Sequence, residues 1–208
     1  MGPSLNSYDL DMDEGTMKLY FSENVLGTAP SPKPNNLTFD STAINFINGN
    51  QNYTISQDTF ATTRRGTEIK VELALKDVES IKLKRHLAVS ASTTSLFIPA
   101  GSELSVNTNV KAVDAPNAVV PISSREPLAV SIYTPDTTAP EVDYYVIDKD
   151  EGLLMLFFTE PVNSNVSIPA ITLQSSALLE TGDSFYQLTQ GSRLDNARDS
   201  KNLTVTFC

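Results

Sequence analysis

The sequence predicts an all-β protein built from Greek-key β-sandwich modules in tandem, and two observations lead to this. Many short segments alternate apolar and polar residues, as strands do when one face of a sheet is buried and the other is wet. The chain also repeats itself, because the acidic turn, the apolar strand and the hydroxyl-Glu pair of residues 3–23 recur in register at residues 140–160. Such a repeat indicates a module in an array, and many short strands at this spacing are typical of a β-sandwich.

The expected elements follow the chain in order. Alternation is clearest in three segments, whose apolar positions are Met17, Leu19 and Phe21; Ile69, Val71, Leu73 and Leu75; and Leu128, Val130 and Ile132. Shorter strands are expected at 43–47, 95–98, 104–113 and 118–122. One short helix is expected over residues 77–87, with Asp77 as its N-cap and an acid in the positive first turn.

The repeat also divides the chain into domains. Residues 3–134 are interpreted as one complete module, residues 135–140 as a stiff Pro- and Thr-containing linker, and residues 141–208 as the first part of a second module. The alternating Leu203, Val205 and Phe207 match Ile69, Val71 and Leu73, and the sequence goes no further. We therefore expect a second module that is either truncated in this sequence or completed by another chain.

Composition narrows the classes of partner. The formal net charge is −10, and nucleic acid is not expected because phosphate binding needs clustered Lys and Arg. The densest basic run, residues 82–86, is interpreted as a solvated helix face. No stretch has the apolar length of a membrane-spanning helix, so no membrane insertion is expected in this segment.

Particular motifs connect the chain to a known family. The acidic turn, the strand after it and residues 21–25 resemble the Ig-like repeats of large extracellular proteins, whose "TFSEPV" signature residues 158–162 closely match. Residues 113–119 resemble a D-x-x-G-N-x-V turn of those repeats, with Pro116 where glycine is expected. Family members occur in bacteria, protists, algae and marine invertebrates.

The resemblance implies an Ig-like fold and an extracellular or cell-surface location. It also implies a non-catalytic structural or adhesive role, as spacer and assembly unit in a fibre or matrix. The implied partners are other copies or neighbouring modules of the same protein and matrix or surface-fibre proteins. The alternative function is a calcium- or carbohydrate-binding module of a secreted protein, and an accessory domain of a secreted enzyme is a third.

The acidic turn has two interpretations. Asp9, Asp11 and Asp13 stand at alternate positions before a glycine, as do Asp148 and Asp150 in the second repeat, and clustered carboxylates suit Ca²⁺. A hairpin with an Asp-Glu-Gly turn also explains the pattern, because it keeps both glycines and does not need Asp9. Likewise, Glu23 and Glu160 are either metal ligands at a module boundary or strand-end residues that bond to backbone N–H groups.

The remaining candidates concern modification and catalysis. Four Asn-x-Ser/Thr sequons begin at Asn36, Asn52, Asn165 and Asn202, and they are candidate glycosylation sites. Cys208, the one cysteine, could pair with another chain or with a cysteine beyond this sequence. The one histidine, His86, is interpreted as a surface residue at a helix end, because no nucleophile-elbow sequence accompanies it. An enzyme is not expected.

Overall fold

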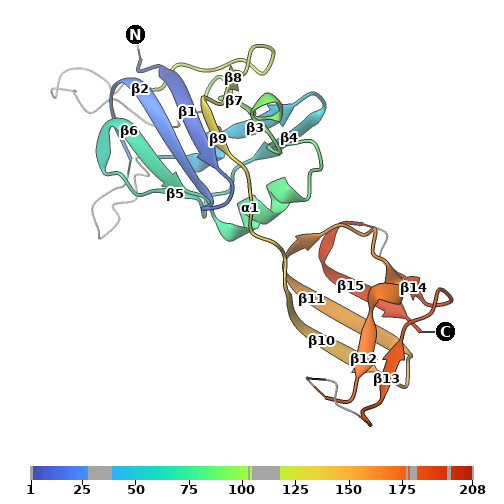
Figure 1. Ribbon diagram of the computed structural model, residues 1–208. Helices are drawn as coiled ribbons and strands as arrows, with labels where there is room; N and C mark the ends of the chain where they lie inside the picture. The colour runs from blue at the N-terminus through green and yellow to red at the C-terminus, as the bar shows by residue number, and fades with distance from the viewer. Residues whose placement is uncertain are drawn as a thin grey trace. The chain divides into compact units, whose positions relative to one another are not determined.

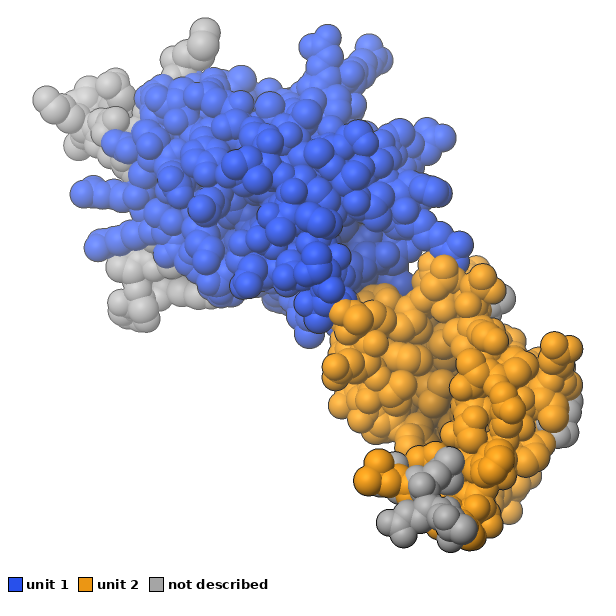
Figure 2. Space-filling model, viewed as in Figure 1, with its two compact units in different colours: residues 1–138 blue, residues 139–208 orange. Residues whose placement is uncertain are grey.

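The computed structural model describes residues 2–27, 39–102, 104, 118–176, 178, 182–195 and 198–207. The protein is mostly β, with 46% of residues in strands and 10% in helices, which confirms the β-rich fold class. The chain divides into two compact units, residues 1–138 (unit 1) and residues 139–208 (unit 2), coloured separately in Figure 2. The boundary between them falls in the Pro- and Thr-containing linker of residues 135–140, which we call the joint.

Unit 1 holds two sheets and a helix (Figure 1). The first sheet has the order β5-β6-β2-β1-β9, with bounds β1 Leu5–Asp11, β2 Thr16–Leu26, β5 Phe60–Ala61, β6 Arg65–Glu72 and β9 Ile132–Thr134. The second has the order β4-β3-β7-β8, with bounds β3 Asn45–Asn48, β4 Gln51–Thr54, β7 Ser95–Phe97 and β8 Leu128–Ala129. The α-helix is α1 (Leu75–Lys82), and 3₁₀ turns occupy Ser41–Ala43 (η1) and Ala91–Thr93 (η2). Strand β9 runs parallel to β1, whereas the other named pairs are antiparallel.

One hydrophobic core joins the two sheets of unit 1. Tyr8 of β1 and Phe46 of β3 are both 0% exposed, and their ring centroids lie 6.3 Å apart. Helix α1 adds Val78 and Ile81 to the same core. Burial of apolar surface on this scale is the main favourable term in folding a domain of this size.

The predicted alternation positions most of this core. The inward residues that the pattern predicts in β2 and β6 are all buried: Met17, Leu19, Phe21, Ile69 and Val71. The pattern ends one step early, however, since Leu75 is 69% exposed and begins α1 rather than extending the strand.

Unit 2 also contains two sheets, but each has fewer strands. The first has the order β10-β11-β15-β14 and the second pairs β12 with β13, with bounds β10 Val142–Asp148, β11 Leu153–Val162, β12 Thr172–Gln174, β13 Phe185–Gln187, β14 Arg193–Leu194 and β15 Ser200–Thr206. A 3₁₀ turn (η3) occupies Ile168–Ala170. The cluster of buried hydrophobic residues in unit 2 is small and consists of Leu154, Leu188 and Val205.

The two units use the same strand register. Leu5 pairs with Phe21 in the β1–β2 hairpin and Val142 pairs with Phe158 in the β10–β11 hairpin, and in both the register shifts directly after this pair. The next strand pairing also begins at equivalent residues. In unit 1 the β2–β6 ladder begins with the pair Thr16↔Glu72, and in unit 2 the β11–β15 ladder begins with Leu153↔Thr206. Residues 3–23 and 140–160 therefore fold into the same local structure.

Helix α1 departs from the sequence expectation. It covers Leu75–Lys82 rather than residues 77–87, and Ala74 stands at its N-cap position. The N-cap assignment of Asp77 was wrong because the Asp77 side chain is engaged elsewhere: it accepts hydrogen bonds from the loop after β4. After Lys82 the backbone makes single turns, such as Lys84 N–H to Ile81 C=O at 2.9 Å.

The late strands of unit 1 also differ from expectation. The single strand expected over residues 128–132 is split, since β8 belongs to the second sheet and β9 to the first. As a result Ile132 is 63% exposed rather than buried. The strand expected at 118–122 is reduced to a bridge between Ile98 and Ile122, and the one expected at 104–113 lies outside the described residues except for Leu104.

Candidate functional site

The acidic turns are hairpin turns stabilised by an aspartate. Asp11 Oδ1 accepts the backbone N–H groups of Asp13 and Glu14 at 3.0 and 2.8 Å. Asp148 Oδ1 accepts those of Asp150 and Glu151, both at 3.0 Å. Aspartate favours such turns because its short side chain can bond the backbone two residues on. This geometry agrees with the interpretation of the acidic repeat as a hairpin turn.

The other two aspartates of the first turn have separate partners. Asp9 accepts a hydrogen bond from the Tyr20 hydroxyl at 2.8 Å, which raises the pKa of Tyr20 to about 12. Asp13 instead accepts from Thr137 and Thr138. Across the described residues, no group of three or more His, Cys, Asp or Glu side chains could hold a metal ion. Calcium binding by Asp9, Asp11, Asp13, Asp148 and Asp150 therefore stays a prediction.

A shallow hollow of about 200 Å³ lies beside Asp9 and Asp11 on the first sheet. Lys18 also lines it and stands directly opposite Asp9 in the ladder. A cationic side chain at this position disfavours a second cation, because like charges repel at short range. The hollow is therefore a poor cation site.

The first turn fixes the start of the joint to unit 1. Asp13 Oδ1 accepts the backbone N–H groups of Thr137 and Thr138 at 2.8 and 3.1 Å, and both hydroxyls at 3.1 Å. Lys82, at the end of α1, forms an ion pair with Asp136 at 2.8 Å. Three consecutive joint residues, Asp136 to Thr138, are thus held by side chains of unit 1.

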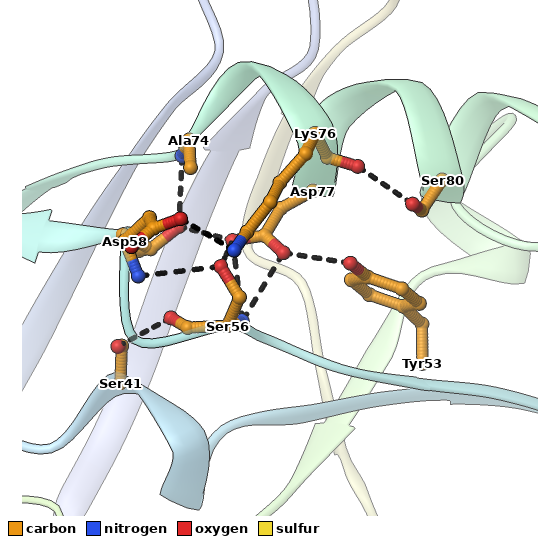
Figure 3. Close-up of polar contacts among 9 residues, drawn as sticks. Ser41, Tyr53, Ser56, Asp58, Ala74, Lys76, Asp77 and Ser80 are labelled. Atoms are coloured by element: carbon orange, nitrogen blue, oxygen red, sulfur yellow. Dashed lines mark hydrogen bonds and ion pairs between the residues drawn. The ribbon is translucent and has the colours of Figure 1, made fainter.

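A second polar cluster surrounds the buried carboxylate of Asp77, which is 0% exposed (Figure 3). Tyr53 donates its hydroxyl to Oδ1 at 2.6 Å, and Thr59 donates its hydroxyl to Oδ2 at 2.5 Å. Ser56 donates both its backbone N–H, at 3.1 Å to Oδ1, and its hydroxyl, at 2.8 Å to Oδ2. Burial is the main reason that the pKa of Tyr53 is raised, and its hydrogen bond to Asp77 adds to the effect. A buried carboxylate is tolerated when donors satisfy its oxygens.

This cluster connects α1 to the loop between β4 and β5. Thr59 Oγ1 both donates to Asp77 and accepts the backbone N–H of Ala74 at 2.8 Å. It therefore satisfies an N–H group at the start of the helix, which a helix cannot satisfy internally. Lys76, the neighbour of Asp77, instead pairs with the exposed Asp58. The cluster holds the helix against the loop.

Sequence reasoning missed this cluster, although a signal for it exists. The segment from Tyr53 to Thr59 has the pattern Tyr-x-x-Ser-x-x-Thr, and the segment from Tyr186 to Ser192 has the pattern Tyr-x-x-Thr-x-x-Ser. The two segments occupy matching positions: β4 pairs with β3 as β13 pairs with β12, and in each the loop residue N–H bonds back across the pattern, Thr59 to Ser56 and Ser192 to Thr189.

In unit 2 an open groove of about 570 Å³ lies between β10, β11 and the β12 region. Apolar residues such as Val142, Tyr145 and Leu173 line most of it, and polar residues at 172 and 174–176 line the rest. Tyr145 is 61% exposed, whereas Tyr8, at the same ladder position in unit 1, is 0% exposed. A contiguous exposed apolar surface often marks a site of interaction with another protein or a ligand.

The modification candidates lie at different places. Asn52 in β4, Asn165 between β11 and η3, and Asn202 in β15 are exposed. Asn36 and Cys208 lie outside the described residues, as do residues 113–117 of the turn that resembles the family.

Three single candidates remain, of which His86 is exposed and the two glutamates are half-buried. His86 is exposed beyond the end of α1, and its backbone C=O accepts from Asn48. Glu23 lies within β2 and Glu160 within β11.

Comparison with family models, curated proteins and solved structures finds no match for this chain. The candidate site therefore has to be interpreted from its own geometry. Among the described residues, no helix combines the length and the apolar character that crossing a bilayer requires.

Proposed function

We propose that the chain carries two copies of one Ig-like Greek-key module from a large extracellular or cell-surface protein, the second copy incomplete within residues 1–208. The module acts as a non-catalytic spacer and assembly unit of a fibre or matrix. Its partners are neighbouring modules and other copies of the same protein. The shared ladder register of the two units supports the module equivalence.

The observation that carries the spacer role is the anchoring of the joint. A spacer must pass a fixed direction from one module to the next, so the linker has to be ordered where it leaves the module. Asp13 and Lys82 provide this order through Thr137, Thr138 and Asp136. In addition, the N–H of Met12 donates to the C=O of Thr134 at 3.0 Å, which extends the β1–β9 pairing to the start of the joint.

Backbone ¹⁵N relaxation of the full chain tests this role. We expect order parameters of about 0.85 at Thr137 and Thr138, as for rigid backbone, and values below about 0.6 in the Asp13→Ala variant. Asp150→Ala is the matched control, because Asp150 holds the same turn position in unit 2 and its side chain forms no hydrogen bond to a described residue. A joint as mobile in the wild type as in Asp13→Ala would refute the spacer role.

The extracellular location has its own test. The sequon at Asn52 lies on an exposed strand position, so glycan attachment meets no steric barrier there. We expect glycan mass at Asn52 when a eukaryotic cell secretes the chain behind a signal peptide, and its loss in Asn52→Gln. Asn50→Gln, at a nearby exposed position outside any sequon, serves as the control. A chain retained in the cell without glycan would count against this location.

A further inference from the structure

The open groove of unit 2 is a surface that the proposed role leaves unused. It lies between β10, β11 and the β12 region. Val142 is 52% exposed and Tyr145 61% exposed, although the residues at the same ladder positions in unit 1, Leu5 and Tyr8, are 6% and 0% exposed.

In unit 1 the corresponding groove positions are covered by later segments of the chain. Strand β9 pairs with the free edge of β1, and β7 pairs with the free edge of β3. The core residues that these later segments and α1 supply include Val78, Ile81, Leu96 and Ile98. In unit 2, no described strand pairs with the outer edge of β10 or β12. In unit 1 the counterparts of these uncovered positions are thus covered by the part of the chain that begins at α1.

Polar chemistry on β13 and in the loop after it specifies the covering segment further. In unit 1 Tyr53, Ser56 and Thr59 donate hydrogen bonds to the carboxylate of Asp77. Unit 2 keeps three hydroxyls at the matching positions, and they belong to Tyr186, Thr189 and Ser192. We call these three residues the hydroxyl socket.

Within the part of unit 2 that the structure describes, the hydroxyl socket has no acceptor. Ser192 is 5% exposed, yet none of the three side chains is hydrogen bonded to a residue that the structure describes. Tyr186 is 52% exposed and Thr189 is exposed too, so a covering segment removes these donors from water, and donors left unpaired under it are costly. A covering segment therefore gains affinity and register from an acidic side chain.

We propose that the open face of unit 2 binds a polypeptide segment with the pattern of residues 73–98: a short helix whose third residue is acidic, followed by an apolar strand. The acidic residue enters the hydroxyl socket, and the apolar strand pairs with the outer edge of β12 and fills the groove. The inference rests on the module equivalence proposed above and not on the extracellular role.

Recognition by such a segment combines two terms. Strand addition to a free edge supplies main-chain hydrogen bonds, with side chains entering pockets at alternate positions. The carboxylate supplies charge-assisted hydrogen bonds, which are about twice as strong as neutral ones. The apolar groove gives affinity to any apolar strand, whereas the hydroxyl socket selects the segment with the acid at the correct place.

The first test uses the full chain and a synthetic peptide of residues 73–98 as the probe. We expect saturable binding in calorimetry and slowed amide exchange in β12, with unit 1 amides unchanged, because the β7 part of the peptide pairs with the β12 edge as β7 pairs with β3. The same peptide with Asp77→Asn should bind about tenfold more weakly, since a charged acceptor is lost. The protein variant Ser192→Ala should show a loss in the same direction, and Thr59→Ser, which keeps the hydroxyl in unit 1, should not.

A second measurement covers the case in which the free peptide fails to adopt its structure. Residues 74–134 are appended after Phe207, so that the added copy follows β15 as the original follows β6. We expect amide exchange of Val142–Asp148 to slow at least about tenfold, and the gain to shrink when Asp77→Asn is made in the added copy only.

The outcomes separate the hypotheses. The docking proposal is overturned if the peptide fails to protect β12 and the appended copy fails to protect β10, or if the unchanged peptide and the Asp77→Asn peptide bind equally. Self-association of the unmodified chain with β10 protected would assign the face to a second copy and overturn the proposed occupant. The joint test with Asp13→Ala does not depend on any of these results, so failure of the spacer role and failure of this proposal are distinguishable.

Discussion

The carboxylate of Asp13 accepts a hydrogen bond from the backbone N–H of Thr137 at 2.8 Å, although 124 residues separate them in sequence. This bond is the main reason that the pKa of Asp13 is lowered, and the other bonds from Thr137 and Thr138 act in the same direction. Since the folded-state pKa lies below the unfolded value, ionised Asp13 stabilises the anchored joint. That stabilisation is complete above the unfolded pKa and is lost as the pH falls through the lowered folded pKa.

We therefore predict that acid releases the joint. In an NMR titration from about pH 6 to about pH 2, the amide shift of Thr137 should stay constant down to the ordinary Asp value of 3.8 and change below it. The Asp13→Asn variant should show no transition of the Thr137 amide. The Thr138 amide senses two carboxylates, because its N–H also donates to Asp136. A midpoint above the ordinary value would contradict the lowered pKa of Asp13.

We predict that Asp77→Ala strongly destabilises unit 1. The change removes a fully buried carboxylate and leaves the donors of Tyr53, Ser56 and Thr59 without their acceptor. Breaking a buried network of this kind costs about 3 kcal/mol or more in the free energy of unfolding.

Urea denaturation measures this change. Asp58→Ala is the control, because the substitution removes an exposed side-chain pair with Lys76, 68% and 55% exposed, and keeps the backbone N–H of residue 58 that donates to Ser56. Such exposed pairs contribute about 0–1 kcal/mol. Equal effects of the two substitutions would show that the Asp77 cluster is not a stability determinant.

The sequence predicts the parts of the fold that local patterns determine. Alternation in β2 and β6 correctly placed Leu19 and Ile69 in the core, because a strand with one buried face has a period of two. The Asp-Glu-Gly turn was recognisable because Gly15 needs a left-handed conformation, with φ of +62°. These features depend on neighbours within a few residues.

Other features depend on distant partners and could not be predicted in this way. The role of Asp77 is set by the hydroxyls about twenty residues earlier, so a helix-cap pattern pointed to the wrong function for it. Alternation over residues 128–132 carries no information on which sheet each residue joins. The aspartates of the first turn share a spacing, yet Asp9 and Asp13 bond to different segments, which spacing alone does not reveal.

We predict that Tyr8→Phe leaves the stability of unit 1 unchanged or raises it by up to about 1 kcal/mol. The Tyr8 hydroxyl is buried and has no hydrogen-bond partner within the described structure, so its removal relieves a desolvation cost. Burial also raises the pKa of Tyr8 well above its ordinary value, which reflects the same lack of solvation.

Thermal unfolding compares this variant with Tyr145→Phe, the same change at the exposed position of unit 2, which should have no measurable effect. A loss of about 1 kcal/mol or more in Tyr8→Phe would reveal a partner for the hydroxyl and contradict the prediction.

The last prediction concerns the two turn glycines. Gly15 and Gly152 have similar positive φ, +62° and +67°, so an alanine at either position adopts a strained left-handed conformation, at a cost of about 1–2 kcal/mol. Only Gly15 faces α1, because a methyl group added there would lie 3.3 Å from Cγ2 of Val78, whereas the one at Gly152 would have nothing within 4 Å.

Gly15→Ala should therefore destabilise unit 1 more than Gly152→Ala destabilises unit 2, as measured by amide exchange within each unit. The excess should shrink when Val78→Ala removes the opposing methyl group, which gives a coupling energy of about 0.5 kcal/mol or more in a double-mutant cycle. If the two substitutions are additive, the helix does not press on the turn, and α1 is not what distinguishes the first turn from the second.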